Sequence, residues 1–295
     1  MGFRAGFVAV VGRPNVGKSS LVNTLVGQKV AIVSDKPQTT RLPIRGILTR
    51  EDFQIVFTDT PGFHKPRTAL GEVLNQRVGE TVADAEVVLL VVDAAAGVGR
   101  GDAYVAQSKV VPHPGPKVCA VNKVDLLRHH AVVPQLAAAG ELAEFDHIVP
   151  VSAKTGAGTG DLLQVLVDAL PEGEPIYPEG VATDLPLSIR VGEVIREKAL
   201  AVTREEVPHS IAVVVEELER DEGRGLTRVQ ATVYVERESQ KPIVIGKGGQ
   251  TLKTIGTRAR EELELLLGSR VYLELRVKVQ REWQRDPAAL ARLGV

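Results

Sequence analysis

The chain has 295 residues, 44% of them hydrophobic and 25% charged, with a net charge of −1. This length favours two domains, since a domain commonly holds roughly 100–200 residues. The near-average composition excludes fibrous, collagen-like and wholly disordered proteins, and the near-zero charge argues against a uniformly basic nucleic-acid coat protein. A single cysteine, Cys119, and histidines without ligand-like spacing exclude an internal disulfide and a cysteine-rich zinc site.

The N-terminus and the apolar runs predict a cytoplasmic protein. The first residues pass directly into a strand-like pattern, without the cleavage region of a signal peptide. No apolar stretch reaches the ~20 residues that a transmembrane helix needs.

Up to about residue 171, short valine-rich runs alternate with amphipathic segments. The runs are expected to be strands buried on both faces, which is typical of parallel sheets. They lie at residues 7–11, 53–57, 87–92, 118–121 and 148–151, and the expected helices lie at 20–26, 70–82, 131–143 and 162–170. This alternation predicts an α/β domain over residues 1–171, with a mostly parallel sheet and helices on both faces.

A phosphate-binding loop follows the first strand. The sequence GRPNVGKS fits the pattern GxxxxGK(S/T) and opens a helix, which is the context that this motif requires. Its glycines allow backbone N–H groups to approach phosphates, Lys18 supplies positive charge to the β- and γ-phosphates, and the Ser19 hydroxyl reaches Mg²⁺. The expected nucleotide-binding residues are Gly12, Arg13, Pro14, Asn15, Val16, Gly17, Lys18 and Ser19.

A polar, turn-rich stretch at residues 34–41 separates this helix from the next strand. A nucleotide hydrolase needs one threonine here, whose hydroxyl ligates Mg²⁺ only when the γ-phosphate is present. We expect Thr40, adjacent to Arg41, to fill this role, and Thr39 is the alternative. The segment should become ordered with the triphosphate and loosen after hydrolysis.

Asp59, Thr60, Pro61 and Gly62 follow the second expected strand and fit the motif DxxG. Asp59 can hold Mg²⁺, commonly through water, and the Gly62 N–H can sense the γ-phosphate. We therefore expect Mg²⁺ to be held by Ser19, Thr40 and Asp59, and catalysis to depend on Lys18, Thr40 and Gly62.

The next residue, Phe63, predicts slow intrinsic hydrolysis, because a phenyl ring cannot orient or activate water. Help would come from a bound monovalent cation such as K⁺, from a backbone carbonyl or from a partner. Asn15 is a candidate cation ligand, and the alternative is that it only shapes the loop. Candidate charge stabilisers in this region are Arg41, Arg45 and Arg67, although solvated arginines are the commoner case in such a region.

Two later motifs identify the base as guanine. Asp125 of the sequence NKVD can accept two hydrogen bonds from the guanine ring N–H and exocyclic amine, a pair of donors that adenine lacks. Asn122 would brace the loop, and the Lys123 stem would cover the base. Ser152, Ala153 and Lys154, after the fifth strand, would offer a backbone N–H to guanine O6. All these motifs lie at carboxyl ends of strands, where open α/β sheets bind ligands.

Residues 171–180 hold three prolines, two glycines and three glutamates without periodicity, and predict a linker that we place at residues 172–184. An α+β domain should follow at residues 185–281, with a C-terminal helix or tail at 282–295. Its expected elements are a helix at 187–199, strands at 210–217, 227–236 and 271–279, and a helix at 250–267.

A GxxG turn in this second domain predicts RNA binding. Val244 and Ile245 are expected to end a strand before the turn, which resembles the loop with which KH domains clamp about four single-stranded nucleotides. Residues 237–260 carry six basic residues and one acidic residue, a net charge of +5. We expect a base-reading groove between the helix that follows and the strand at 227–235. The expected RNA-binding residues are Gly246, Lys247, Gly248, Gly249 and Lys253.

The order of these motifs, with Gln38, Thr39, Thr40 and Arg41 between the first two and residues 244–250 near the end, resembles the Era family of bacterial GTPases. The resemblance covers nearly the whole chain. It implies a Ras-like P-loop GTPase domain joined to a KH domain, and GTP-dependent binding near the 3′ end of 16S ribosomal RNA during assembly of the 30S ribosomal subunit. It also implies GTP and Mg²⁺ as ligands, a monomer without a DNA partner, and peripheral association with the inner face of the cell membrane, for which the sequence offers no anchor.

Two other functions deserve comparison. A non-catalytic RNA-binding chaperone would use guanine nucleotide as a structural ligand, and Phe63 gives it some support. An ATP-dependent P-loop kinase is disfavoured by the sequence at residues 122–125. We favour a switch, in which GTP orders the loops around Thr40 and Asp59 and thereby exposes the RNA groove.

Overall fold

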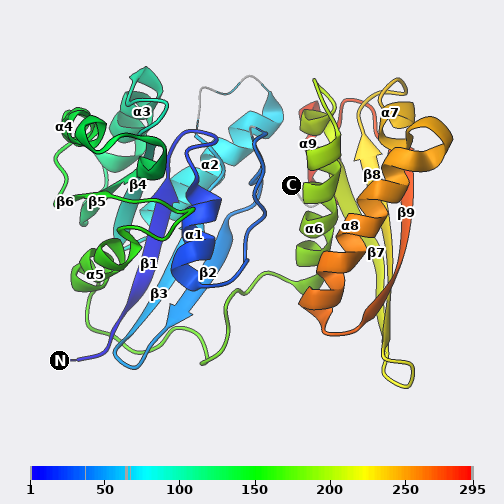
Figure 1. The fold of residues 1–295 in the computed structure, drawn as a ribbon, viewed down its shortest axis with the longest axis horizontal. Helices are drawn as coiled ribbons and strands as arrows, with labels where there is room; N and C mark the ends of the chain where they lie inside the picture. Colours follow the sequence, from blue (N-terminus) through cyan, green and yellow to red (C-terminus); the bar gives the residue numbers. More distant parts are fainter. Residues whose placement is uncertain (1, 37, 64–65, 67, 294–295) are drawn as a thin grey trace. The chain divides into compact units, whose positions relative to one another are not determined.

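The computed structural model describes residues 2–36, 38–63, 66 and 68–293 (Figure 1). Its contacts divide the chain into two compact units. The first comprises Met1–Val33, Thr40–Arg67 and Gly71–Asp184, and the second comprises Ser34–Thr39, Thr68–Leu70 and Leu185–Val295.

The first unit contains a six-stranded sheet in the order β2-β3-β1-β4-β5-β6. All neighbouring strands are parallel except β2, which pairs with β3 in antiparallel fashion at one edge. The mostly parallel sheet predicted from sequence is therefore confirmed, while β2, which follows the polar stretch at residues 34–41, is not among the strands that the sequence predicts. The strands are β1 (Arg4–Val11), β2 (Ile44–Thr49), β3 (Phe53–Asp59), β4 (Val87–Asp93), β5 (Lys117–Asn122) and β6 (His147–Pro150).

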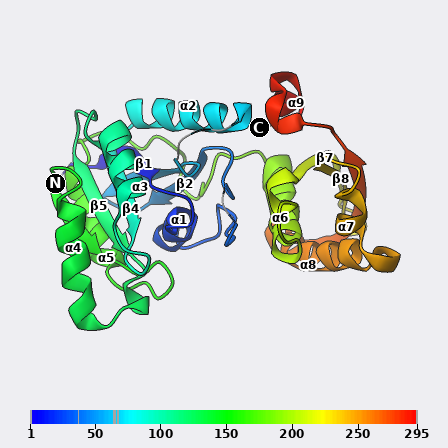
Figure 2. The same ribbon diagram turned by 90° about the horizontal axis from the view of Figure 1, so that it is seen from above.

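Helices cover both faces of this sheet (Figures 1 and 2). Val8 and Val10 of β1 pack with residues of α1 (Lys18–Val26) and α5 (Thr159–Ala169), whereas the intervening Ala9 and Val11 pack with α2 (Ala69–Ala83), α3 (Arg100–Val105) and α4 (Val132–Gly140). Because successive strand residues point to opposite faces, the valine-rich strands supply both cores. The sequence did not predict α3, which continues into a π-helical turn at Ala106–Val110.

The segment at 172–184, predicted as a linker, groups with the first unit. The fully buried Gln54 holds it: Gln54 Oε1 accepts hydrogen bonds from the Ile176 and Tyr177 N–H groups at 2.7 and 2.8 Å. The Ile47 N–H of β2 donates to the Ala182 carbonyl at 2.8 Å. The long continuous part of the second unit therefore begins at Leu185, after this segment.

The second unit contains a three-stranded sheet in the order β7-β8-β9, with β7 antiparallel and β9 parallel to β8. Val191 and Ile195 of α6 (Leu187–Val202) and Ile255 and Leu263 of α8 (Gln250–Leu267) share one core with β8 residues. The strands are β7 (Ala212–Asp221), β8 (Leu226–Val235) and β9 (Arg270–Val279). The predicted α/β followed by α+β organisation is confirmed.

One local prediction in the second unit is wrong. Val244 and Ile245 do not end a strand but belong to the short helix α7 (Lys241–Ile245), which has proline in its first turn. Their β-branched side chains favour a strand locally, yet Val244 is buried in the core that the helices of this unit share with β8. The C-terminal segment contains α9 (Pro287–Arg292) and the buried Trp283, whose Nε1 donates to the Ser210 carbonyl at 3.0 Å.

Within the described part of the chain, no helix combines the length and apolarity that crossing a bilayer requires.

Candidate functional site

The phosphate-binding loop joins β1 to α1. Gly17 has φ 97°, and a Cβ atom there would lie 2.4 Å from Asn122 Nδ2, so only glycine fits this position. Lys18 Nζ donates to the carbonyls of Gly12 at 3.1 Å and Arg13 at 3.0 Å. Burial lowers the pKa of Lys18 to about 8, although the charge of Asp59 opposes this shift. The loop thus presents a buried amine at the N-terminus of a helix, an arrangement suited to phosphate.

Ser19, Thr40 and Asp59 come together from three separate segments. Ser19 Oγ donates to Asp59 Oδ2 at 2.6 Å, Thr40 Oγ1 donates to the same oxygen at 3.1 Å, and the two hydroxyls lie 3.0 Å apart. Asp59 is fully buried, and its Oδ1 has no hydrogen-bond partner among the described residues. Burial raises the pKa of Asp59, while Lys18 and the two hydroxyls lower it. This set of hard oxygen atoms, with one buried oxygen unpaired, fits Mg²⁺.

Thr39, the alternative to Thr40, has a different environment. Its hydroxyl donates to the Lys36 carbonyl at 2.7 Å. The structure therefore brings Thr40, and not Thr39, to Ser19 and Asp59.

The DxxG segment lies against the phosphate-binding loop. A Cβ atom at Gly62 would lie 2.7 Å from Pro14 Cγ, and Thr60 Oγ1 donates to the Val10 carbonyl at 2.7 Å. Phe63 is 6% exposed; its ring stacks on Tyr104 with 5.3 Å between centroids, and Lys109 Nζ lies 4.8 Å from its centroid. Phe63 is thus a packing residue anchored to α3 and its π-helical turn. Tyr104 and Lys109 cannot be found from the sequence, because no motif contains them.

Asn122 connects three loops at the base end of the site. Its Nδ2 donates to the Val16 carbonyl at 2.9 Å, and its Oδ1 accepts from the Ala153 N–H at 3.0 Å. Lys123 Nζ donates to the Asn15 carbonyl at 2.7 Å and pairs with Asp93 at 2.6 Å. Asp93, at the end of β4, is a contact that the motif analysis missed.

Asp125 and the segment at 152–154 meet as predicted from their positions at strand ends. Ser152 Oγ donates to Asp125 Oδ1 at 2.6 Å, while Asp125 and Lys154 are exposed and Ser152 and Ala153 are buried. A hydrogen bond from the Thr24 hydroxyl to the Ala153 carbonyl, 2.7 Å long, fixes this loop to α1. An exposed carboxylate is thus held beside a rigid loop.

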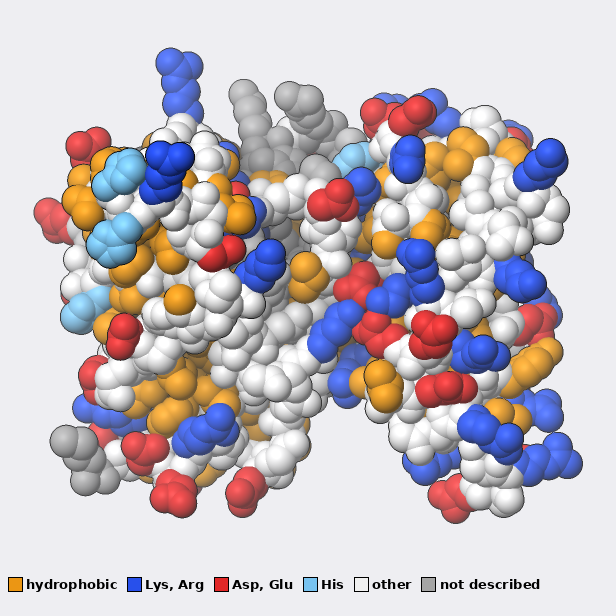
Figure 3. Space-filling model, in the orientation of Figure 1, with side chains coloured by type: hydrophobic (Ala, Val, Ile, Leu, Met, Phe, Trp, Pro, Cys, Tyr) orange, Lys and Arg blue, Asp and Glu red, His pale blue; other side chains and the backbone are white. Residues whose placement is uncertain are grey.

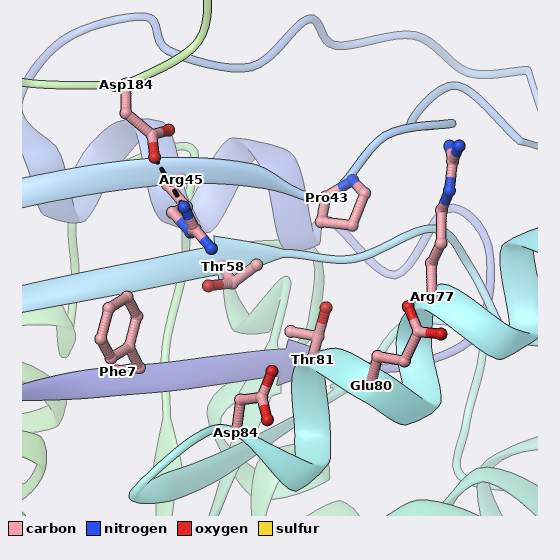
Figure 4. Close-up of a pocket in the computed structure, with 9 residues that line it drawn as sticks. All are labelled: Phe7, Pro43, Arg45, Thr58, Arg77, Glu80, Thr81, Asp84 and Asp184. Carbon is pink, nitrogen blue, oxygen red and sulfur yellow. Dashed lines mark hydrogen bonds and ion pairs between the residues drawn. The ribbon is translucent and has the colours of Figure 1, made fainter. Parts of the chain in front are cut away.

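The three candidate arginines differ in position. Arg41 is buried, and Arg67 lies outside the described residues. Arg45 pairs with Asp184 at 2.7 Å, and its guanidinium lies over the Phe7 ring at 5.7 Å. Asp184 and Phe7 therefore hold this guanidinium. Figure 4 shows this pair beside a cavity of about 630 Å³ that is bordered by strand residues, including Thr58, and by residues of α2. The α2 residues are Arg77, Glu80 and Thr81, and Asp84 follows the end of this helix.

In the second unit, the GxxG loop adopts backbone conformations that favour glycine. Gly246, Gly248 and Gly249 have φ values of 77°, 59° and 78°, and α8 begins directly after them. The side chains of Lys247 and Lys253 are exposed. Figure 3 shows basic and acidic side chains interspersed on the visible face of this unit, so the basic excess is local to the loop region.

A groove of about 410 Å³ runs beside the loop, between α8 and β9. The expected position against the strand at 227–235 is wrong, because β8 is the central strand and β9 occupies the edge. Leu252, Gly256 and Leu273 contribute to the lining, and Arg260 and the 58% exposed Tyr272 add polar and aromatic surface.

Comparisons with known proteins agree with this geometry. A family model described as 50S ribosome-binding GTPase matches residues 7–123, and a KH domain model matches residues 206–284. GTPase Era of Mycolicibacterium smegmatis is 50% identical over 295 residues, covering 99% of both chains. The chain belongs to the Era family of GTPases. Era of Mycobacterium tuberculosis strain H37Rv is 51% identical over 296 residues, again covering 99% of both chains.

Solved Era structures match the whole fold. A crystal structure of Era in complex with MgGDPNP and nucleotides 1506–1542 of 16S ribosomal RNA has a TM-score of 0.96 and 41% identity, covering 99% of each chain. A variant of Aquifex aeolicus Era bound to GDP·AlF₄⁻ has a TM-score of 0.95 and 41% identity, with the same coverage. The predicted family is confirmed, and the chain is a GTPase rather than a non-catalytic chaperone.

Proposed function

We propose that this Era-family chain is a GTP-hydrolysing switch that binds 16S ribosomal RNA near its 3′ end and assists assembly of the 30S subunit. The proposal rests on one observation in each unit. In the first unit, Lys18, Ser19, Thr40 and Asp59 come together at one site. The second unit carries a GxxG loop. The Era structures with MgGDPNP and an RNA fragment, and with GDP·AlF₄⁻, support guanine nucleotide, Mg²⁺ and RNA as ligands.

In the proposed catalytic site, Ser19, Thr40 and Asp59 would hold Mg²⁺, which would neutralise charge on the phosphates. Lys18 would leave its two carbonyl partners for the β- and γ-phosphates, and the Gly62 N–H would contact the γ-phosphate. The packing of Phe63 against Tyr104 supports slow intrinsic turnover, because its ring is not able to orient water. A K⁺ ion near Asn15 would assist, and comparing turnover in KCl and NaCl tests this part of the proposal.

Guanine would be recognised by Asp125, with Asn122 and the segment at 152–154 shaping the pocket. The Asp125→Asn variant should lose about a hundredfold or more in GDP affinity and gain affinity for XDP, since an amide no longer accepts both guanine donors. Isothermal titration with GDP and XDP measures both changes. The matched control is Asp161→Asn, which alters another exposed aspartate, in the first turn of α5. Unchanged GDP affinity in Asp125→Asn would refute the assignment.

RNA would be held by the GxxG loop through Gly246, Lys247, Gly248 and Gly249, with Lys253 beside it and bases in the groove between α8 and β9. Coupling to nucleotide is tested by titrating a 16S 3′-end RNA fragment into the GTP-analogue form and the GDP form. Tighter binding by the GTP-analogue form is expected, and equal affinities contradict the switch. Peripheral membrane association is a separate proposal, which rests on the family resemblance. Flotation of the protein with anionic vesicles tests it.

A further inference from the structure

The side chain of Arg13, the second residue of the phosphate-binding loop, is directed to α3. Its Nε pairs with Asp102 Oδ1 at 2.7 Å, and its NH2 group donates to the Gly97 carbonyl at 3.3 Å. The Asp102 side chain is 0% exposed and that of Arg13 is 30% exposed. A charged pair with one fully buried member therefore joins the loop to a helix 89 residues later in the chain.

Asp102 does more than cap its own helix. Its Oδ2 accepts the Gly99 N–H at 2.9 Å, as a capping residue does, and this leaves Oδ1 for Arg13. The preceding residue also fits Arg13, because a Cβ atom on Gly101 would lie 2.4 Å from Arg13 Cδ. The start of α3 thus provides both the charge and the space that this arginine needs.

The backbone of Arg13 continues the connection to the phosphate site. Its carbonyl accepts the Lys18 ammonium at 3.0 Å, next to the Gly12 carbonyl at 3.1 Å. A shift of Arg13 would therefore move the carbonyl that holds Lys18. The Arg13 guanidinium does not serve to bind phosphate, because moving it away would leave the buried Asp102 carboxylate without a cation.

We propose that Asp102 is a positioning residue for nucleotide binding, which fixes the first turn of the phosphate-binding loop through its ion pair with Arg13. The inference rests on the proposed guanine-nucleotide site and adds a contribution from α3 to it. Because the loop and Lys18 would hold the β-phosphate that GTP and GDP share, the pair acts on the affinity for both nucleotides. It contributes little to the hydrolytic step itself.

The first test is Asp102→Asn, whose amide oxygen can still cap Gly99 but whose charge is lost. The affinities for GDP and a GTP analogue, measured by titration, should each fall about tenfold, and the single-turnover rate at saturating GTP should change less than about twofold. The matched control is Asp184→Asn, which breaks another arginine–aspartate pair of 2.7 Å in the same unit, away from the loop. It should keep the GDP affinity of the unmodified chain. If Asp102→Asn also keeps that affinity, the inference is wrong.

A double-mutant cycle separates positioning from general destabilisation. If Asp102 acts through Arg13, the double variant Arg13→Gln with Asp102→Asn should bind GDP no more weakly than the weaker single variant. Additive losses would overturn the inference.

Should Asp102→Asn fail to fold, the variant Arg13→Lys is tested instead. Lysine keeps a cation but lacks the planar fork of arginine, so this variant should lose affinity for GDP about threefold to tenfold. Normal affinity in Arg13→Lys would then refute the pairing role, whereas a failure of the unmodified chain to bind GDP would refute the proposed function instead.

Discussion

Single residues in this protein connect loops that are far apart in the chain. Asn122 contacts both the phosphate-binding loop and the loop at 152–154, and Asp59 gathers hydroxyls from two other segments. Both side chains are almost completely buried, so each unsatisfied atom is costly. The unpaired Oδ1 of Asp59 is consistent with a cation whose ligands are assembled before it binds.

Thr40 and Thr39 provide a matched pair of neighbouring variants. Thr40→Ala should lower the single-turnover rate of GTP hydrolysis by about a hundredfold, because a ligand needed only with the γ-phosphate is lost. GDP affinity should change little. Thr39→Ala serves as the control, since its hydroxyl contacts Lys36 instead. Hydrolysis is measured over a Mg²⁺ titration, and equal losses in both variants would contradict the assignment.

The motifs predicted which residues gather at the strand ends, because spacing and chain order carry that information. They did not predict Asp93, Asp102 or Tyr104. The fold of β4 and α3 brings these residues to Lys123, Arg13 and Phe63. No spacing rule connects Asp102 to Arg13 across 89 positions. For the same reason the sequence could not reveal that Arg45 pairs with Asp184.

At the scale of the elements, the groove between α8 and β9 is the feature that the sequence predicts least well. The alternating pattern of a strand reveals its two faces but not its place in the sheet. The sequence therefore predicts β8 as the wall of the groove, whereas the structure has β9 there. The edge position of β9 leaves Tyr272 exposed, where an aromatic ring can stack on an unpaired base. Shape and sheet order, more than composition, define this groove.

Two glycines at opposite ends of α8 allow a controlled test of the GxxG loop. Gly248 has φ 59° and Gly268 has φ 61°, and a Cβ atom at either position would meet nothing within 4 Å. Gly248→Asp should weaken binding of a 16S 3′-end RNA fragment more than about tenfold, since a carboxylate would oppose the phosphates. Gly268→Asp carries the same strain and charge at the C-terminal end of the helix and should bind normally. Fluorescence anisotropy measures both affinities, and similar weakening in the two variants would argue against a clamp at the loop.

For the whole molecule, the length and the change in sequence pattern along the chain predicted two domains. Only the structure shows that the segment between them is held by the first unit. Proline, glycine and glutamate at 171–180 indicate an irregular segment and do not reveal whether it is held. Gln54, within an expected strand, makes the hydrogen bonds that hold it, and these depend on side-chain direction that the sequence pattern does not encode. Net charge is similarly uninformative, because a total of −1 includes a region of +5 around the GxxG loop.

The attachment of residues 172–184 to the first unit depends mainly on Gln54. Gln54→Ala would remove the acceptor of the Ile176 and Tyr177 N–H groups and the donor to the Tyr177 carbonyl. We expect a loss of about 2 kcal/mol or more in the stability of the first unit, because buried polar groups lose their partners, and faster proteolysis within 172–184. Thermal unfolding with GDP present and mapped limited proteolysis measure these effects. Gln76→Ala is the control, since among the described residues its amide hydrogen-bonds to Glu80 alone, in an exposed pair on α2. If Gln54→Ala resists protease as well as Gln76→Ala does, the segment is held by its backbone contacts to β2 and β1 instead of by Gln54.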